Sequence, residues 1–166
     1  PKVRLALLCG KIEDSFATVF RQVVLTRFEQ KMHKARKEEG ELSSERFNTL
    51  WTEANQPMFG DSVNLSENYG YWWSYIGHFI HVPFYCYAYS FGELLVLALV
   101  QKYEQEKESF VPKYMDLLSR GGSESPVDLL ARMNIDLNDP GFWGLGLKLL
   151  DRMVTEVEEL ATQLGK

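Results

Sequence analysis

Apolar residues recur at spacings of three and four along residues 3–39, and this periodicity limits the possible folds more than any other feature. The stripe consists of Leu5, Leu8, Ile12, Phe16, Phe20, Val23, Val24 and Phe28. Such spacing predicts one long amphipathic helix, which Gly40 would end. At 1.5 Å per residue the helix would be about 55 Å long, so we expect a bend or break within it.

The rest of the chain also predicts helices, because apolar stripes alternate with capping and turn residues. We expect a helix at 44–55 that ends before Pro57, followed by a loop at 56–66. A short helix should then run to about residue 75, and an irregular piece should follow at 77–82. The next helix is expected from about Pro83 to about Glu106.

Three more helices are expected in the last third of the chain. Gly121-Gly122 would end a helix over 114–120, and Ser125-Pro126-Val127-Asp128 forms a capping box that opens a helix ending near Asn134. Asp139-Pro140 opens the last helix, to about Leu164. No segment alternates with period two over a convincing length. We therefore predict an all-α chain of six or seven helices, forming one helical domain over residues 1–166.

Composition excludes several functional classes. The 166 residues suit a single domain, and a net charge of −5 argues against nucleic-acid binding. Lys31–Lys37 is interpreted as a solvated helix face. The longest apolar run, Leu94–Val100, is seven residues, too short to span a bilayer, so no membrane partner is expected. Cys9 and Cys86 are interpreted as buried free thiols, which predicts a cytoplasmic location.

The stretch Tyr71–Val100 has an unusual composition for a helical core. It holds two of the three histidines and five of the eight tyrosines, and its one formal charge is Glu93. We expect this stretch to be buried. Phenol and imidazole groups are costly to bury without partners, whereas Leu or Ile would fill the same space without that cost. The stretch therefore predicts a hydrated cleft wall.

The candidate site residues are the histidines and tyrosines of this stretch. His78 and His81 could share a metal, hydrogen bond within the core, or bind substrate. Tyr85 and Tyr89 would share one face of a regular helix, with Tyr87 about 200° around it. At least one of these hydroxyls could donate to a developing oxyanion.

Three segments together resemble the oligoendopeptidase F family of zinc metallopeptidases (peptidase family M3). They are A-T-V-F-R-Q-V-V-L-T-R-F-E at Ala17–Glu29, W-S-Y-I-G-H-F-I-H-V-P-F-Y-C-Y-A-Y-S-F-G-E-L-L at Trp73–Leu95, and F-V-P-K-Y-M-D-L-L-S-R-G-G-S-E-S-P at Phe110–Pro126. The similarity runs in order over nearly the whole chain and matches the C-terminal part of the family. It implies a multi-helix C-terminal lobe of a thimet-oligopeptidase-like helical peptidase.

The resemblance also implies an activity and a set of site residues. Family members hydrolyse short peptides with zinc held by H-E-x-x-H and a downstream Glu, while a His and a Tyr bind the substrate. In this chain the resemblance assigns the histidine to His78 first and to His81 second. It assigns the tyrosine to Tyr87 first and to Tyr85 second. H-E-x-x-H is absent from the chain, which begins at Pro1. We therefore expect a C-terminal fragment that lacks zinc and is inactive alone.

Two functional hypotheses follow. The first is the substrate-binding part of a zinc-dependent metalloendopeptidase that acts on short oligopeptides. The alternative is a metal-free helical interaction domain without catalytic activity. An H-E-x-x-H upstream of Pro1 in the reading frame would separate them. A severed fragment would also expose apolar surface that normally packs on the missing part, so we expect self-association.

Overall fold

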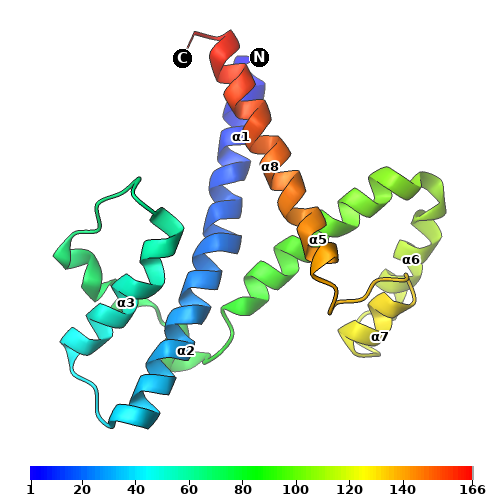
Figure 1. Cartoon of the computed structure of the whole chain (residues 1–166). Coiled ribbons are helices and arrows are strands. Elements are labelled where there is room, and N and C mark those ends of the chain that lie inside the picture. The colour runs from blue at the N-terminus through cyan, green and yellow to red at the C-terminus, as the bar shows by residue number, and fades with distance from the viewer. Residues whose placement is uncertain (166) are drawn as a thin grey trace. The chain divides into compact units, whose positions relative to one another are not determined.

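The computed structural model describes residues 1–165, and this part of the chain is helical without a strand (Figure 1). The predicted all-α class is confirmed. The chain divides into two compact units. One is formed by Pro1–Asp14 together with Gly92–Lys166, and the other by Ser15–Phe91. Within residues 1–165, none of the helices has the length and hydropathy that a bilayer span requires.

The predicted long helix is confirmed, but a π-helical turn interrupts its α-helical geometry. It consists of α1 (Lys2–Ser15), the π-helical segment η1 (Phe16–Phe20) and α2 (Arg21–Glu39). A π turn changes the hydrogen-bond register without ending the helix, and such turns are frequent at functional sites. Gly40 has a φ of 86° and ends the helix as expected.

The Ser15–Phe91 unit contains η1 and α2, followed by shorter elements. These are α3 (Ser44–Phe59), the 3₁₀ segment η2 (Glu67–Tyr75), α4 (His78–His81) and the first residues of α5 (Tyr87–Glu106). Its core joins α2 to α3 and to the segment around α4. The core residues are Val24, Leu25, Phe28, Ala35, Leu50, Trp51, Ala54, Ile76 and Cys86.

The expected helix end before Pro57 is wrong, because α3 continues through Pro57 to Phe59. Proline lacks the N–H that would bond to the preceding turn, but this close to the end of the helix only one such bond is lost. Gly60, with a φ of 52°, then ends the helix, and its N–H donates to the Gln56 carbonyl at 2.9 Å. The expected loop is correspondingly shorter.

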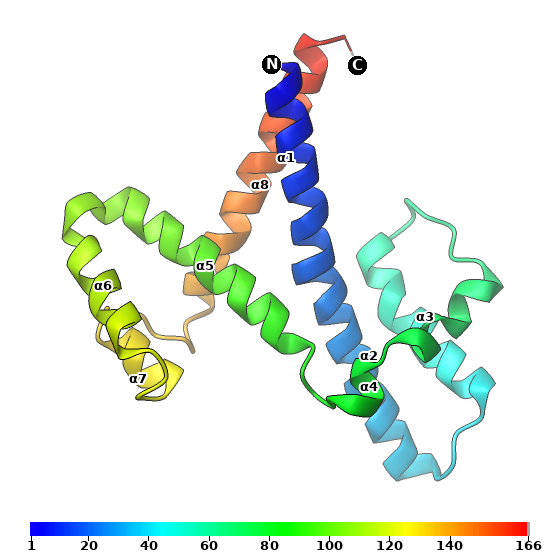
Figure 2. The same ribbon diagram turned by 180° about the vertical axis from the view of Figure 1, so that it is seen from behind.

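The other unit contains α1, the rest of α5, and the C-terminal helices. These are the 3₁₀ segment η3 (Lys107–Ser109), α6 (Val111–Arg120), α7 (Pro126–Ala131) and α8 (Pro140–Gln163). Figures 1 and 2 show α1 beside α8. The guanidinium of Arg4 pairs with Glu156 across these helices, and Lys11 pairs with Glu93 of α5 at 3.0 Å.

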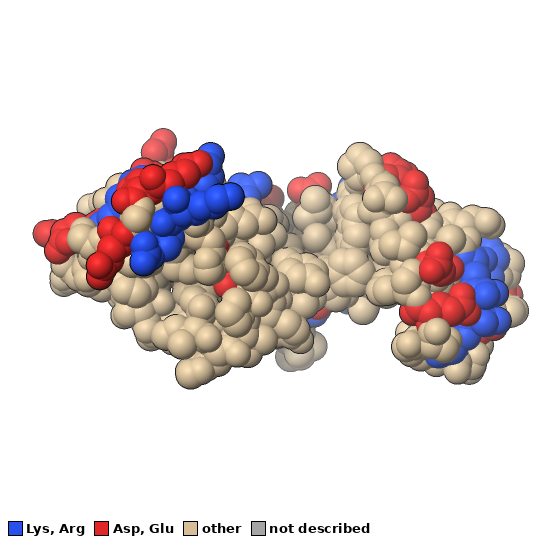
Figure 3. All heavy atoms as spheres, turned by 90° about the horizontal axis from the view of Figure 1, so that it is seen from below, with Lys and Arg blue, Asp and Glu red and all other residues tan. Residues whose placement is uncertain are grey.

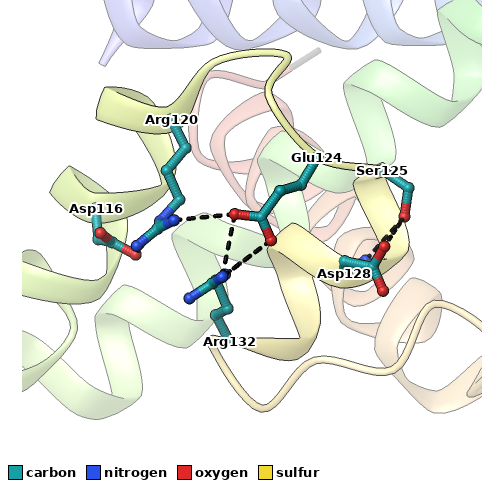
Figure 4. A network of polar contacts seen from close by, with 6 residues as sticks. All are labelled: Asp116, Arg120, Glu124, Ser125, Asp128 and Arg132. Atoms are coloured by element: carbon teal, nitrogen blue, oxygen red, sulfur yellow. Dashed lines mark hydrogen bonds and ion pairs between the residues drawn. The ribbon is translucent and has the colours of Figure 1, made fainter.

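The predicted caps of this unit are confirmed. The Ser125 hydroxyl accepts the N–H of Asp128 at 3.2 Å, and a carboxylate oxygen of Asp139 accepts the N–H of Gly141 at 2.8 Å. The segment before α7 is also held by charge, since Glu124 lies between Arg120 and Arg132 (Figure 4). Helix α7 ends at Ala131 rather than near Asn134.

Candidate functional site

Much of the aromatic stretch is exposed, which corrects the expectation that it is buried. Tyr71, Trp72 and Tyr75 are each about half exposed, and so are Tyr85 and Tyr87. Within the Ser15–Phe91 unit, the buried residues of the stretch are isolated ones, among them Ile76, Cys86 and Ser90. An aromatic side chain with a polar tip can keep that tip in water while its ring packs on neighbours, so no buried partner is needed.

The backbone around the histidines also differs from the expectation. The piece expected to be irregular is a single helical turn, α4, and the following helix α5 begins at Tyr87 rather than near Pro83. The reason lies at Phe84, whose φ of 59° is incompatible with a right-handed helix. Residues 83–86 therefore form a turn between the histidine segment and the tyrosine helix.

Three of the aromatic side chains meet at this turn. The His78 Nε2 atom lies 3.0 Å from the Tyr89 hydroxyl oxygen, within hydrogen-bond distance. The His78 and Tyr85 rings are nearly parallel with centroids 6.4 Å apart, and the Tyr85 and Tyr89 rings meet edge to face at 5.5 Å. His78, Tyr85 and Tyr89 are called the His–Tyr cluster below. Its groups can donate hydrogen bonds at neutral pH.

The other two predicted site residues lie outside this cluster. His81 is at the end of α4 with an exposed side chain. Tyr87 is 58 % exposed, and in the described part of the chain no hydrogen bond or ring contact joins it to His78 or Tyr85. The structure thus brings His78 and Tyr85 together and leaves His81 and Tyr87 exposed beside them.

Two contacts from the long N-terminal helix fix the backbone around the cluster. The Ser90 hydroxyl donates to the Val19 carbonyl of the π-helical segment η1 at 2.9 Å. The Phe84 N–H donates to a carboxyl oxygen of Glu29 in α2 at 2.8 Å. Burial, and then the nearby charge of Glu29, raise the pKa of the Cys86 thiol. The two ends of the tyrosine segment are therefore both anchored.

The chain around the cluster carries no formal charge. Residues 68–92 contain no Asp, Glu, Lys or Arg. In Figure 3 the charged side chains of this unit gather on α2 and α3, next to a surface almost without charge. Two ion pairs join α2 to α3, namely Lys31–Glu53 at 3.2 Å and Arg46–Glu39 at 2.6 Å. The predicted solvated face at Lys31–Lys37 is confirmed.

A cavity elsewhere in the chain is apolar and lacks the predicted site residues. It has a volume of about 310 Å³ and lies between α5 and α6. Its walls are formed by Val96, Leu99, Val100, Tyr103, Phe110, Val111 and Tyr114. It offers no imidazole or carboxylate, so it is not the place for acid–base chemistry. The predicted site residues His78 and Tyr85 lie instead in the His–Tyr cluster.

The residues of this chain do not fit a zinc ion. Among residues 1–165, no group of three or more His, Cys, Asp or Glu side chains converges on a point that could hold a metal. A catalytic zinc needs three protein ligands, whereas the predicted H-x-x-H offers only His78 and His81, on one helical turn. His78 is already within hydrogen-bond distance of Tyr89.

Sequence reasoning did not prefer Tyr89 as a site residue, and it missed Glu29. Tyr89 shares a helix face with Tyr85, so the spacing of four was a usable signal, but the resemblance favoured Tyr85 and Tyr87. Glu29 gave no signal, because its contact with Phe84 joins positions 55 residues apart in the chain. A buried carboxyl on an apolar stripe cannot be told from an exposed one by periodicity alone.

Comparison with known proteins agrees with the resemblance seen in the sequence. Residues 4–148 match the model of peptidase family M3. The chain is 31 % identical to oligopeptidase PepF of Bacillus subtilis over 159 residues, which is 96 % of this chain and 24 % of that protein. It is 30 % identical to the plasmid-encoded oligoendopeptidase F of Lactococcus lactis, covering 96 % of this chain and 26 % of the relative.

A solved structure extends the agreement to the fold. The crystal structure of oligoendopeptidase-F from Enterococcus faecium superposes with a TM-score of 0.90 at 26 % identity, over 98 % of this chain and 31 % of the other. The chain thus spans about a quarter of the length of the curated relatives it matches. Since the family match covers most of the residues, the chain belongs to peptidase family M3.

Proposed function

We propose that this chain is the C-terminal, substrate-binding part of a zinc-dependent metalloendopeptidase that hydrolyses short oligopeptides. The observation that carries the proposal is the His–Tyr cluster, in which His78 lies against Tyr85 and Tyr89 on an uncharged surface. Family membership supplies the reaction class, and the names of the relatives support oligopeptides as substrates. The zinc ligands, H-E-x-x-H and a Glu, are proposed to lie upstream, outside this chain.

Within this proposal the chain's own residues bind and polarise the peptide. When bound, zinc supplies Lewis-acid chemistry and an activated water. His78, held by Tyr89, and the exposed hydroxyl of Tyr87 donate hydrogen bonds to the scissile carbonyl as it gains negative charge. Tyr85 stacks against the His78 ring and keeps it in place, while His81 contacts the peptide beside it.

The location and association state are part of the proposal. Cys9 and Cys86 are free thiols, and Cys86 is buried, which supports a reducing, cytoplasmic environment. Self-association of the isolated chain stays a prediction, supported by exposed apolar side chains on α5 and α6 such as Val96, Met115 and Leu118.

The test uses the full-length, metal-loaded peptidase. We expect His78→Ala and Tyr87→Phe each to lower kcat by about 10²–10³-fold, because each removes a donor to the oxyanion. Zinc content and the melting temperature should stay nearly unchanged. Tyr85→Phe is the matched control, since it keeps the ring that stacks on His78 and removes only a hydroxyl.

Two results would contradict the assignment. If Tyr87→Phe keeps the wild-type kcat and Tyr85→Phe loses it, the donor to the oxyanion is Tyr85 and not Tyr87. Normal turnover in all three variants would make the aromatic segment structural. A full reading frame without H-E-x-x-H would favour the metal-free interaction domain instead.

A further inference from the structure

Glu29 is a carboxylic acid in the core of the Ser15–Phe91 unit. Its exposed fraction is 1 %, and it sits in α2 between the apolar core residue Phe28 and the solvent-facing Gln30. Carboxyl groups are rarely buried this completely, because their burial is costly unless a hydrogen bond compensates for it. An apolar residue would fill the position without that cost. The polar group must therefore be explained by its partner.

That partner is the backbone N–H of Phe84, 2.8 Å from the carboxyl oxygen of Glu29. Phe84 has a φ of 59°, a left-handed conformation that bulky residues rarely adopt. Its ring packs on His33 of α2, with centroids 4.7 Å apart. Two contacts with α2, one to the backbone and one to the ring, thus hold a residue in a strained conformation.

The strained residue occupies the one turn that joins the two halves of the His–Tyr cluster. His78 lies in α4, before the turn, and Tyr89 lies in α5, after it. The direction in which α5 leaves the turn depends on the backbone at position 84. Relaxation of Phe84 to a negative φ would redirect the chain and separate His78 from Tyr89.

We propose that Glu29 is a positioning residue for substrate binding: by accepting the Phe84 N–H it fixes the turn over residues 83–86, and so holds His78 against Tyr85 and Tyr89. This inference rests on the proposed function of the cluster. Glu29 itself touches none of the reacting atoms. Its effect on catalysis passes through the backbone of one turn.

The first experiment replaces Glu29 in the full-length, metal-loaded peptidase. Glu29→Leu removes the acceptor, and we expect kcat/KM to fall by about 10²-fold, the effect of displacing a reacting group by about 1 Å. Glu29→Gln is the conservative variant, because its amide oxygen can still accept the Phe84 N–H, and it should keep most of the activity. Should Glu29→Leu not fold, Glu29→Asp, which withdraws the carboxyl by one methylene, gives the same comparison.

The second experiment separates positioning from a merely structural role. Glycine adopts a positive φ without strain, so Phe84→Gly should restore kcat/KM about tenfold in the Glu29→Leu background. Phe84→Ala is the matched control, because it removes the same ring contact with His33 but keeps the Cβ that opposes a positive φ. A general loss of packing would make the glycine variant no better than the alanine variant.

Hydrogen exchange at the backbone amides of residues 77–89 gives a readout independent of activity. We expect faster exchange of the Phe84 amide in Glu29→Leu, and unchanged exchange in Glu29→Gln. Wild-type exchange together with full activity in Glu29→Leu would overturn the inference, as would equal rescue by Gly and Ala. If wild-type protein cleaves no peptide, the proposed function fails, while the exchange data still decide whether Glu29 fixes the turn.

Discussion

The absence of a side chain at Gly146 allows α8 to approach α5 closely. A Cβ atom at this position would lie 2.9 Å from the backbone carbonyl oxygen of Leu94 and 3.4 Å from the Cβ of Leu97. We expect Gly146→Ala to lower the free energy of unfolding by about 1–3 kcal/mol, because a backbone atom cannot move aside for the new methyl group. The shift of the urea midpoint measures this change.

Gly144, two residues earlier in α8, is the matched control. A Cβ there would meet no heavy atom within 4 Å. Gly144→Ala should therefore raise the free energy of unfolding by about 1 kcal/mol through helix propensity alone. Equal shifts of the same sign in both variants would show that close packing at Gly146 is unimportant.

Single residues were predictable from the sequence where the signal is local. The caps Ser125 and Asp139 and the helix end at Gly40 each depend on neighbours a few positions away. The contact of His78 with Tyr89 was less accessible, because it depends on how a turn redirects the chain. The role proposed for Glu29 was inaccessible, since nothing near position 29 indicates that its partner is a backbone amide far along the chain.

At the scale of elements, the sequence predicted the helices and missed some of their ends. The boundary errors at Pro57 and Pro83 have one source, which is the reading of proline as a marker of a helix end or start. Pro57 lies in the last turn of α3, where one missing hydrogen bond is tolerated. Pro83 lies before Phe84, and the backbone of Phe84 delays the start of α5 to Tyr87.

The pairing of α1 with α8 predicts a dependence of stability on pH. Glu156 of α8 accepts a hydrogen bond from the Arg4 guanidinium of α1, and this bond lowers the pKa of Glu156 below the ordinary value. A carboxylate with a lowered folded-state pKa contributes stability above its unfolded pKa of about 4.3, and loses it as the pH falls through the lowered value. We expect Glu156→Gln to be less stable than wild type at pH 7, and the difference to vanish once the pH falls below the lowered pKa of Glu156.

Thermal unfolding at a series of pH values checks this expectation. The difference between Glu156→Gln and wild type should also shrink in high salt, since Arg4 is exposed to solvent and Glu156 partly so. Glu159→Gln, at an exposed position on the same helix, is the control and should follow the wild-type curve. A difference between Glu156→Gln and wild type that stays constant with pH would assign the effect to packing.

At the scale of the whole molecule, the chain covers only about a quarter of its relatives and contains no converging set of metal ligands in residues 1–165. We therefore predict that the isolated chain neither retains zinc nor cleaves peptides, because a catalytic zinc requires three protein ligands and an activating carboxylate. Dialysis against a weak chelator followed by metal analysis, and a peptide cleavage assay, check the two parts. Stoichiometric zinc or cleavage by the pure chain would contradict the prediction.

The family and the all-helical fold could be predicted at this scale because three segments of the sequence matched in order. The division into two units could not, since it depends on which helices pack together. Local periodicity gives α1 and α8 their apolar faces but does not say that Arg4 meets Glu156, 152 residues later.

The discontinuity of one unit has a consequence for synthesis on the ribosome. Within this chain, helix α1 is made before the Ser15–Phe91 stretch and its partner α8 after it, whereas Ser15–Phe91 is one uninterrupted stretch. At roughly 5–20 residues per second, α1 emerges from the exit tunnel several seconds before α8. Vectorial folding therefore favours completion of the Ser15–Phe91 unit, with its aromatic cluster, before α1 can pack against α8.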